Sequence, residues 1–436
     1  MTTSNEAAEP LLQVALDFLE LPRALKVAEA AVAGGADILE AGTPLLKSEG
    51  LDAVRQLRAR FPRMRIVADM KTMDAGRIEM EAAAKAGANV AVVMGASSEA
   101  TVRECVEAGR NYGVAVGVDL LGVEDIVAVA RRCEELGADH LDIHTPIDEQ
   151  MTGADPFERL RLVREAVSLP LAAAGGINSE TAAEAVAAGA DIVIVGGAIS
   201  KSVDPRRATE EIKRAITTGE KIATALYRRV GLEQVREVLL NVSSANASDG
   251  GHRLPPLTGI RAVTPGHKLV GPAFTVRTYP GDWAKPVEAI DEAARGDVIV
   301  IDAGGVAPAI WGELATHSCL AREVGGVVIH GGIRDTEDIR AMKFPAFATL
   351  ITGRAGEPKG LGEINVPITI GGIHIAPGDW IVGDDDGVIV LPKNEAVEIT
   401  NRAMDCLERE NRIRAEIDDG KTTLASVMEL LKWEKK

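Results

Sequence analysis

Six ionisable side chains stand at the ends of short apolar segments in the first half of the chain. Carboxylates, an ammonium and an imidazole are the groups that hold a divalent cation and move protons in acid–base catalysis. One such residue is usually a helix cap or a structural polar group, but charges inside an apolar frame are costly unless they are paired or bind a metal. We therefore interpret the set as one catalytic site, comprising Asp17, Glu40, Asp69, Lys71, Asp119 and His144.

The apolar segments that carry these residues recur eight times over residues 11–216. Alanine- and glutamate-rich helical stretches such as Arg23–Ala33 separate them, and most of these stretches stop at a glycine. Eight strand–helix units of this length predict a (β/α)8 TIM barrel, with an open doubly wound sheet as the less favoured alternative. A barrel places its chemistry at the carboxyl ends of its strands, where the six residues occur.

Two glycine pairs follow the seventh and eighth expected strands, Gly175–Gly176 in AAAGGIN and Gly196–Gly197 in VIVGGAI. A single glycine pair usually marks only a turn. In a barrel, however, the loops after strands seven and eight commonly hold a phosphate on backbone amides. The residues thus predict a divalent metal, a lysine–carboxylate relay and a sugar phosphate.

Residues 11–216 resemble 3-hexulose-6-phosphate synthase, of the orotidine-monophosphate-decarboxylase superfamily. The resemblance rests on ALDF, LEAGTPL, ADMKTMDAG, GVDLLG and HTPIDEQ, and above all on the Asp-x-Lys-x-x-Asp signature of Asp69, Lys71 and Asp74. The sister enzyme, 3-keto-L-gulonate-6-phosphate decarboxylase, is expected to carry an arginine where this chain has Gly197, which favours the synthase. Pro146 departs from the family's usual glycine in the loop after strand six.

This resemblance implies a reversible aldol addition of formaldehyde to ribulose 5-phosphate through an enediolate. Glu40 and Asp69 would hold Mg²⁺ or Mn²⁺, and His144 would be the base. Lys71, flanked by Asp69 and Asp74, would stabilise the developing oxyanion or shuttle protons. Asp17 would position Lys71 or the substrate, while Asp119 and the four glycines would bind the substrate. The residue matching Asp74 acts across a dimer interface in related enzymes, so we expect a dimer of barrels.

The pattern changes in the second half of the chain. We expect the barrel over residues 1–216, a linker over 217–240 with an amphipathic connecting helix at residues 222–240, a second α/β domain over 241–400 and a charged helical tail over 401–436. The polar run SSANASDGG with the following LPPL predicts a loop. The acidic run Asp384–Asp386 predicts a tight hairpin turn rather than a metal site.

Arg334 and Asp335 follow a predicted strand, with Glu313 at a spacing of Glu-x20-Arg-Asp. With GPAFTV, GGVAPAIWGELA and PGDWIVGDDDGVIVLP, this resembles the aldolase branch of the RraA-like family, a swivelling-type α/β fold. The resemblance implies a metal-dependent lyase for a 2-oxo acid, with Glu313 and Asp335 on Mg²⁺ or Mn²⁺ and Arg334 on the carboxylate. The amides of Gly312, Glu313 and Leu314 would anchor the same carboxylate. His317 is a possible base, although a packing role is equally compatible.

The whole-chain properties limit the function further. With 65 acidic and 48 basic residues the net charge is −17, which argues against a nucleic-acid partner. The absence of a long apolar run argues against a membrane span, and the polar start with four scattered cysteines favours the cytoplasm. If the barrels of this chain pair as dimers and its RraA-like units form trimers, the protein is a homo-oligomer, in the simplest case a hexamer. A non-catalytic assembly module or a ribonuclease regulator remains the alternative for the second domain.

Overall fold

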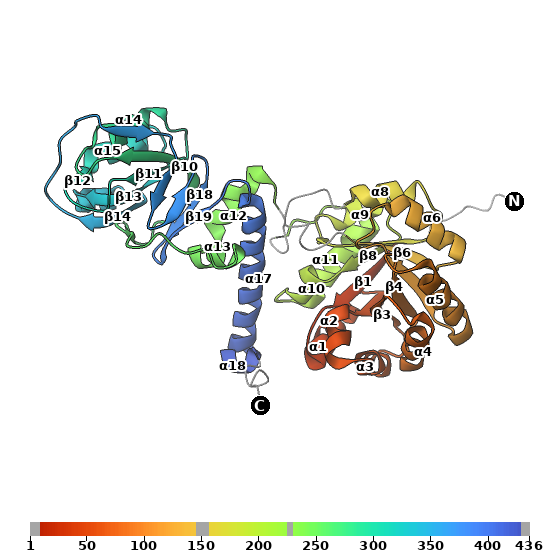
Figure 1. Ribbon diagram of the computed structural model, residues 1–436. Coiled ribbons are helices and arrows are strands. Elements are labelled where there is room, and N and C mark those ends of the chain that lie inside the picture. The colour runs from red at the N-terminus through yellow and green to blue at the C-terminus, as the bar shows by residue number, and fades with distance from the viewer. Residues whose placement is uncertain (1–8, 145–156, 225–229, 429–436) are drawn as a thin grey trace. The chain divides into compact units, whose positions relative to one another are not determined.

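The computed structural model describes residues 9–144, 157–224 and 230–428 (Figure 1). The described chain divides into two compact units. The first holds the N-terminal part up to residue 224 together with residues 408–428, and the second holds residues 230–407. Each unit has its own hydrophobic core.

The first unit is a closed barrel of parallel strands, in which β1 pairs with both β2 and β8. This is the predicted TIM barrel. Its strands are β1 (Leu11–Leu16), β2 (Ile38–Ala41), β3 (Arg65–Thr72), β4 (Val90–Met94), β5 (Ala115–Asp119), β6 (His140–His144), β7 (Leu171–Ala174) and β8 (Ile192–Val195).

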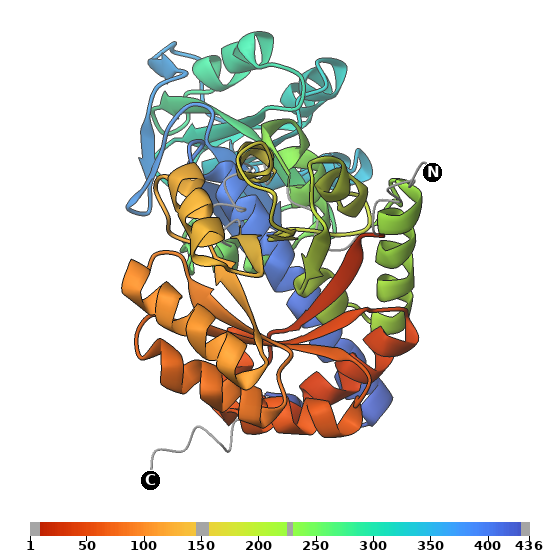
Figure 2. The ribbon, with the colours of Figure 1, turned by 90° about the vertical axis from the view of Figure 1, so that its right-hand side faces the viewer.

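Helices surround the strands on the outside, as both ribbon views show (Figures 1 and 2). Gly87 and Gly137 end two of them in the left-handed region, at φ of 100° and 89°, which confirms their role as helix stops. The described helices are α1 (Leu21–Ala33), α2 (Thr43–Glu49), α3 (Asp52–Arg60), α4 (Gly76–Ala86), α5 (Glu99–Tyr112), α6 (Ile126–Leu136), α8 (Glu158–Arg164), α9 (Ala182–Ala187), α10 (Gly197–Ser200) and α11 (Pro205–Thr218).

Two apolar layers fix the barrel. The outer layer packs the helices against the outward faces of the strands. The inner layer is made of small and branched aliphatic residues, Ala15, Ile38, Val67, Val90, Val92, Ala172, Ile192 and Ile194. Because no aromatic side chain belongs to this inner cluster, space remains for polar side chains at the carboxyl ends of the strands.

The second unit is a mixed sheet in the order β19-β18-β10-β11-β13-β14-β9, with β10, β11, β13 and β14 parallel. Its strands are β9 (Arg261–Ala262), β10 (Leu269–Thr278), β11 (Val298–Asp302), β12 (Ala309–Trp311), β13 (Gly326–Ile333), β14 (Ala346–Ile351), β15 (Gly362–Ile364), β16 (Ile368–Ile370), β17 (Ile373–Ile375), β18 (Trp380–Asp384) and β19 (Gly387–Leu391). Its helical segments are η1 (Leu232–Gln234), α12 (Val235–Asn241), α13 (Ser244–Gly250), α14 (Ala284–Glu292), α15 (Glu313–Ala321) and α16 (Thr336–Ala341).

A long helix, α17 (Ala396–Gly420), follows the sheet and is succeeded by α18 (Leu424–Val427). The expected charged helical tail is therefore present. The acidic run also behaves as predicted, because Asp384 pairs with Gly387 across the β18–β19 hairpin.

Two local predictions were wrong. The connecting helix does not fill residues 222–240: Gly231 is extended, α12 begins only at Val235, and residues 225–229 lie outside the described chain. The run SSANASDGG forms helix α13 instead of a loop, because Ser243 accepts a hydrogen bond from the amide of Asn246 and caps the helix. A serine before a short polar stretch can therefore start a helix as readily as a turn.

None of the described helices combines the length and the apolar character needed to cross a bilayer.

Candidate active sites

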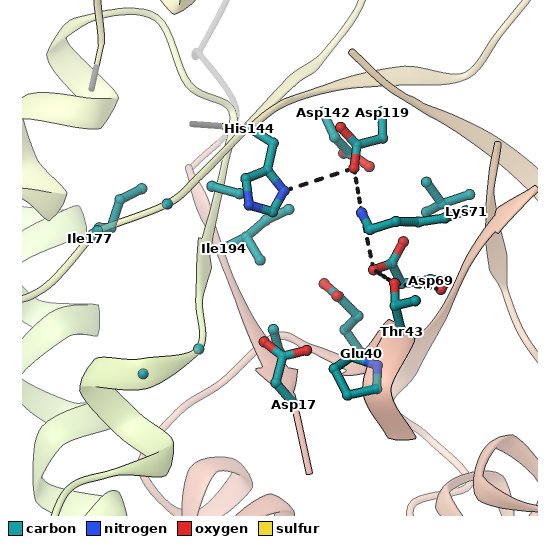
Figure 3. A pocket seen from close by; sticks show the side chains of 18 residues that line it. Asp17, Glu40, Thr43, Asp69, Lys71, Asp119, Asp142, His144, Ile177 and Ile194 are labelled. Carbon is teal, nitrogen blue, oxygen red and sulfur yellow. Dashed lines mark hydrogen bonds and ion pairs between the residues drawn. The ribbon is translucent and has the colours of Figure 1, made fainter. Parts of the chain in front are cut away.

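The six strand-end side chains of the barrel converge on one cavity of about 340 Å³ at the carboxyl ends of the strands (Figure 3). Each belongs to a different strand end, apart from Asp69 and Lys71, which share β3. The four predicted glycines, Gly175, Gly176, Gly196 and Gly197, line the same cavity. The structure thus brings together most of the predicted barrel residues.

Lys71 lies between two carboxylates. Its Nζ is 2.5 Å from Oδ2 of Asp119 and 3.3 Å from Oδ2 of Asp69. The backbone of Lys71 is left-handed, with φ of 46°, at an irregularity in the β3–β4 pairing, a conformation that costs energy for a non-glycine residue. Burial lowers the pKa of the Lys71 ammonium, but Asp69 and Asp119 outweigh it, so the pKa is raised.

Asp74, which flanks Lys71 in the sequence signature, lies apart from Lys71 within the chain. It is exposed in the turn after β3 and does not line the cavity. The second carboxylate beside Lys71 is Asp119, whose strand ends at the cavity. A role for Asp74 in another subunit's site stays a prediction.

Asp119 is a buried carboxylate with several partners. Its Oδ1 accepts the amide hydrogen of Leu121 at 2.8 Å, and its Oδ2 lies 3.8 Å from Nδ1 of His144. Burial alone would raise the pKa of Asp119, but interactions with His144 and Lys71 lower it below its ordinary value. Asp119 therefore stays ionised and can orient both Lys71 and the imidazole.

Glu40 and Asp69 form a pair of buried carboxylates. The side-chain amide of Gln13 donates to Oε2 of Glu40 at 2.6 Å, and the hydroxyl of Thr43 donates to Oδ2 of Asp69 at 2.6 Å. Burial and the charges of Asp69 and Asp17 raise the pKa of Glu40 well above its ordinary value. Burial also raises the pKa of Asp69, although Lys71 and Thr43 oppose it.

This surplus of negative charge fits a divalent cation. Among the described lining residues, Lys71 is the permanently charged cation. The same lining carries five carboxylates, those of Asp17, Glu40, Asp69, Asp119 and Asp142. Nowhere in the described ranges do three or more acidic, histidine or cysteine side chains form a ready-made metal cage. Mg²⁺ commonly takes one or two carboxylates and completes its shell with water and substrate, so Glu40 and Asp69 suit it.

Asp17 opens into the cavity, and two glycines make room for it. A Cβ at Gly42 would lie 2.1 Å from Oδ1 of Asp17, and a Cβ at Gly196 would lie 3.1 Å from Oδ2. Loss of solvation among these neighbours, together with the charge of Asp69, raises the pKa of Asp17. A larger residue at position 42 or 196 would therefore crowd the carboxylate of Asp17, whatever turn the glycine also forms.

Among the charged residues that line the cavity in the described chain, the predicted set omitted Asp142 of β6. Its signal was the alternation His140, Asp142, His144, which places all three on the inner face of the strand. Pro146, which departs from the family pattern, lies outside the described residues.

The second unit has a cavity of about 290 Å³ lined by the predicted Gly312, Glu313, Leu314, Arg334 and Asp335. Nε of Arg334 is 3.3 Å from Oδ2 of Asp335. The same oxygen accepts the amide hydrogen of Glu313 at 3.2 Å, so that amide is already engaged within the chain.

The rest of this cavity is largely apolar, with Trp283, Val287 and Trp311 in its walls. His317 does not line it, although its Nε2 lies 3.6 Å from Oε2 of Glu313; the imidazole is 62% exposed. The cavity therefore offers the guanidinium of Arg334 as a partner for a carboxylate. The acidic side chains of Glu313 and Asp335 lie beside it, in partly apolar surroundings.

Comparison with known proteins gives a separate match for each unit. A family model described as orotidine 5′-phosphate decarboxylase / HUMPS family matches residues 10–212, and one described as RraA-like, Aldolase/RraA, matches residues 241–390. The barrel is similar to a 3-hexulose-6-phosphate synthase of Bacillus subtilis, 36% identical over 209 residues, which are 48% of this chain and 99% of that protein.

Two further relatives agree over the same half of the chain. A 3-hexulose-6-phosphate synthase of Mycobacterium gastri is 38% identical over 205 residues, covering 47% of this chain and 99% of its own length. A solved structure of 3-hexulose-6-phosphate synthase from Salmonella typhimurium is 36% identical, covers 48% of this chain and 100% of its own, and superimposes with a TM-score of 0.47.

Proposed function

The chain belongs through its barrel to the orotidine 5′-phosphate decarboxylase / HUMPS family, and on that premise we propose that the barrel is a 3-hexulose-6-phosphate synthase. Relatives that span the whole barrel carry that name, which is the name of a lyase. The observation that carries the proposal is the Lys71 relay beside the Glu40–Asp69 pair, in one cavity with the glycines after β7 and β8.

In this reaction His144 removes a proton from C1 of ribulose 5-phosphate, next to the C2 carbonyl, and an enediolate forms. Its C1 attacks the carbon of formaldehyde, a carbon–carbon bond forms, and the former aldehyde oxygen takes up a proton. Glu40 and Asp69 would hold a divalent cation, which would supply Lewis-acid stabilisation of the developing negative charge. Lys71, held by Asp69 and Asp119, stabilises the developing oxyanion and gives that proton.

The experiment is formaldehyde consumption with ribulose 5-phosphate and Mg²⁺, measured on the wild type, Asp69→Ala and Arg334→Ala. We expect turnover by the wild type and Arg334→Ala and none by Asp69→Ala. Equal turnover by Asp69→Ala would place the chemistry outside this cavity.

The main competitor is decarboxylation of 3-keto-L-gulonate 6-phosphate by the same barrel. Gly197 lines the cavity at the position where that enzyme is expected to carry an arginine, so the cationic contact is missing. Release of carbon dioxide from this substrate, without formaldehyde consumption, would favour the decarboxylase instead.

For the second unit we propose a metal-dependent lyase acting on a 2-oxo acid. The proposal rests on Glu313, Arg334 and Asp335 sharing one cavity. Arg334 would bind the carboxylate and stabilise a pyruvate-type enolate, while Glu313 and Asp335 would hold Mg²⁺ or Mn²⁺ largely through water. Oxaloacetate decarboxylation tests it: we expect Arg334→Ala to lose the activity and Asp69→Ala to keep it. A wild type inert toward oxaloacetate and other 2-oxo acids would favour a non-catalytic assembly module.

We also propose that the chain is a homo-oligomer in which barrels pair and RraA-like units form trimers, giving a closed hexamer. Light scattering that returns a monomer mass would contradict this assembly.

A further inference from the structure

Asp142 occupies a position in the barrel cavity that the proposed mechanism does not use. It lies on β6 directly opposite Asp119 of β5 and Ala172 of β7, and it is 7% exposed. Figure 3 shows it beside Asp119 in the wall of the cavity. Two carboxylates that face each other on neighbouring strands repel, so this arrangement has an energetic cost.

The two carboxylates differ in their partners. Asp119 is bound by the ammonium of Lys71 and by the amide of Leu121. Oδ1 of Asp142, in contrast, is enclosed by the protein and lies 3.2 Å from Nε2 of His140. Asp142 also lines the cavity, and among the described residues its side chain has no donor other than His140. A nearly buried carboxylate with a single donor calls for a further partner.

His140 lies one inward-facing position below Asp142, deeper in the barrel. Space for its ring comes from Gly117 of β5, where a Cβ would stand 2.6 Å from both Cε1 and Nε2 of the imidazole. Burial lowers the pKa of His140, but Asp142 and Asp139 outweigh it and raise the pKa. His140 therefore lies against Asp142 beneath the cavity, and Gly117 leaves room for its ring.

The cavity that Asp142 lines has apolar side chains in its wall, among them Val92, Ala174 and Ile194, and the ammonium of Lys71 is engaged by Asp69 and Asp119. β6 pairs with β7, so Asp142 lies one strand away from the strand that the first glycine pair follows. A polyol phosphate held at those glycines carries hydroxyl groups along its length.

We infer that Asp142 is a substrate-binding residue that accepts a hydrogen bond from a hydroxyl of the bound sugar phosphate, and that His140 is its positioning residue. The inference rests on the proposed function of the barrel. A water bound to the divalent cation is the other possible O–H donor, and the experiment separates the two.

The test is calorimetric titration of ribulose 5-phosphate into the Mg²⁺-loaded full chain, with a separate titration of Mg²⁺ alone. We expect Asp142→Asn and Asp142→Ala to weaken sugar-phosphate binding about tenfold or more, the value of a charge-assisted hydrogen bond, while Mg²⁺ affinity stays unchanged. His140→Leu should weaken it similarly, whereas His140→Gln, which retains a donor, should restore most of the affinity. Asp302→Asn is the matched control, because Asp302 pairs with His330 in the second unit, 2.8 Å from Oδ1 to Nδ1.

Other outcomes overturn the inference in distinguishable ways. Unchanged sugar affinity in Asp142→Ala, with or without a lower melting temperature, would make the His140–Asp142 pair purely structural. A parallel loss of Mg²⁺ affinity without sugar would assign the O–H donor to water. Failure of the wild type itself to bind ribulose 5-phosphate would overturn the proposed function, and this inference with it.

Discussion

Nζ of Lys71 lies 2.5 Å from Oδ2 of Asp119, and this contact joins the end of β3 to the end of β5 across the mouth of the barrel. Because Asp119 also faces His144, the ammonium and the imidazole share one carboxylate. Moving one of these three groups therefore displaces the other two, so the site should respond to substitution as a unit.

Lys71→Ala should lower kcat of formaldehyde consumption by about a hundredfold or more, because an oxyanion-stabilising cation and proton donor is lost. Asp119→Asn should also lower kcat, since it releases both Lys71 and His144. Steady-state kinetics of the two single variants and the double variant measure the coupling. Strictly additive losses in the double variant would contradict a shared relay.

Glu40→Gln should raise the melting temperature of the metal-free chain, because burial and neighbouring carboxylates disfavour the charged form of Glu40. Mg²⁺ should stabilise the wild type by binding the folded state, and this gain should largely disappear in Glu40→Gln. Thermal unfolding with and without Mg²⁺ checks both effects. An equal Mg²⁺-induced shift in the variant would remove Glu40 from the cation site.

Gly42→Ala should reduce barrel activity without unfolding the chain. Its new Cβ would stand 2.1 Å from Oδ1 of Asp17, and the carboxylate at the free end of that side chain is the group able to move. Gly353→Ala is a suitable control, since a Cβ there meets no atom within 4 Å. Kinetics and circular dichroism of the two variants form the test; full activity in Gly42→Ala would show that the position of Asp17 is unimportant.

Asp74 should act in a neighbouring subunit's site, which mixed oligomers can reveal. Asp74→Ala and His144→Ala should each be inactive alone. After co-refolding in equal amounts, about a quarter of the wild-type activity should return, because half of the paired barrels then contain one intact site. If Asp74→Ala alone is fully active, the role that the family resemblance implies for Asp74 is wrong.

The His140–Asp142 pair should give stability a defined pH dependence. Since the pKa of His140 in the folded chain is raised above its ordinary value of 6.5, the pair stabilises fully below that value. This contribution disappears as the pH rises through the folded pKa. Asp142, Asp139 and Arg65 are the charged groups that act on the imidazole. Chemical denaturation of the wild type and His140→Gln should show the wild-type advantage shrinking as the pH rises above 6.5; a constant difference would contradict it.

The sequence predicted the barrel and the convergence of its strand-end residues because both follow from short-range patterns. Apolar segments at a steady interval define the strands, and the barrel topology brings their carboxyl ends together. The Glu313–Arg334–Asp335 set followed from a motif spacing in the same way, and the structure places it in one cavity.

Local sequence was less informative where one polar contact decides the conformation. The Ser243 cap converted an expected loop into helix α13, and the extended backbone at Gly231 delayed the start of α12. Propensity alone does not resolve such cases, since serine and glycine serve turns and helix ends alike.

By itself, the sequence determined which residues could perform the chemistry and on which strands they stand. Only the tertiary structure decided their pairing. Lys71 is bound by Asp119 rather than Asp74, Gly42 and Gly196 make room for Asp17, and Asp142 rests on His140 above Gly117. These contacts join strands that are distant in sequence, and the register and curvature of the closed barrel set them, which no local pattern encodes.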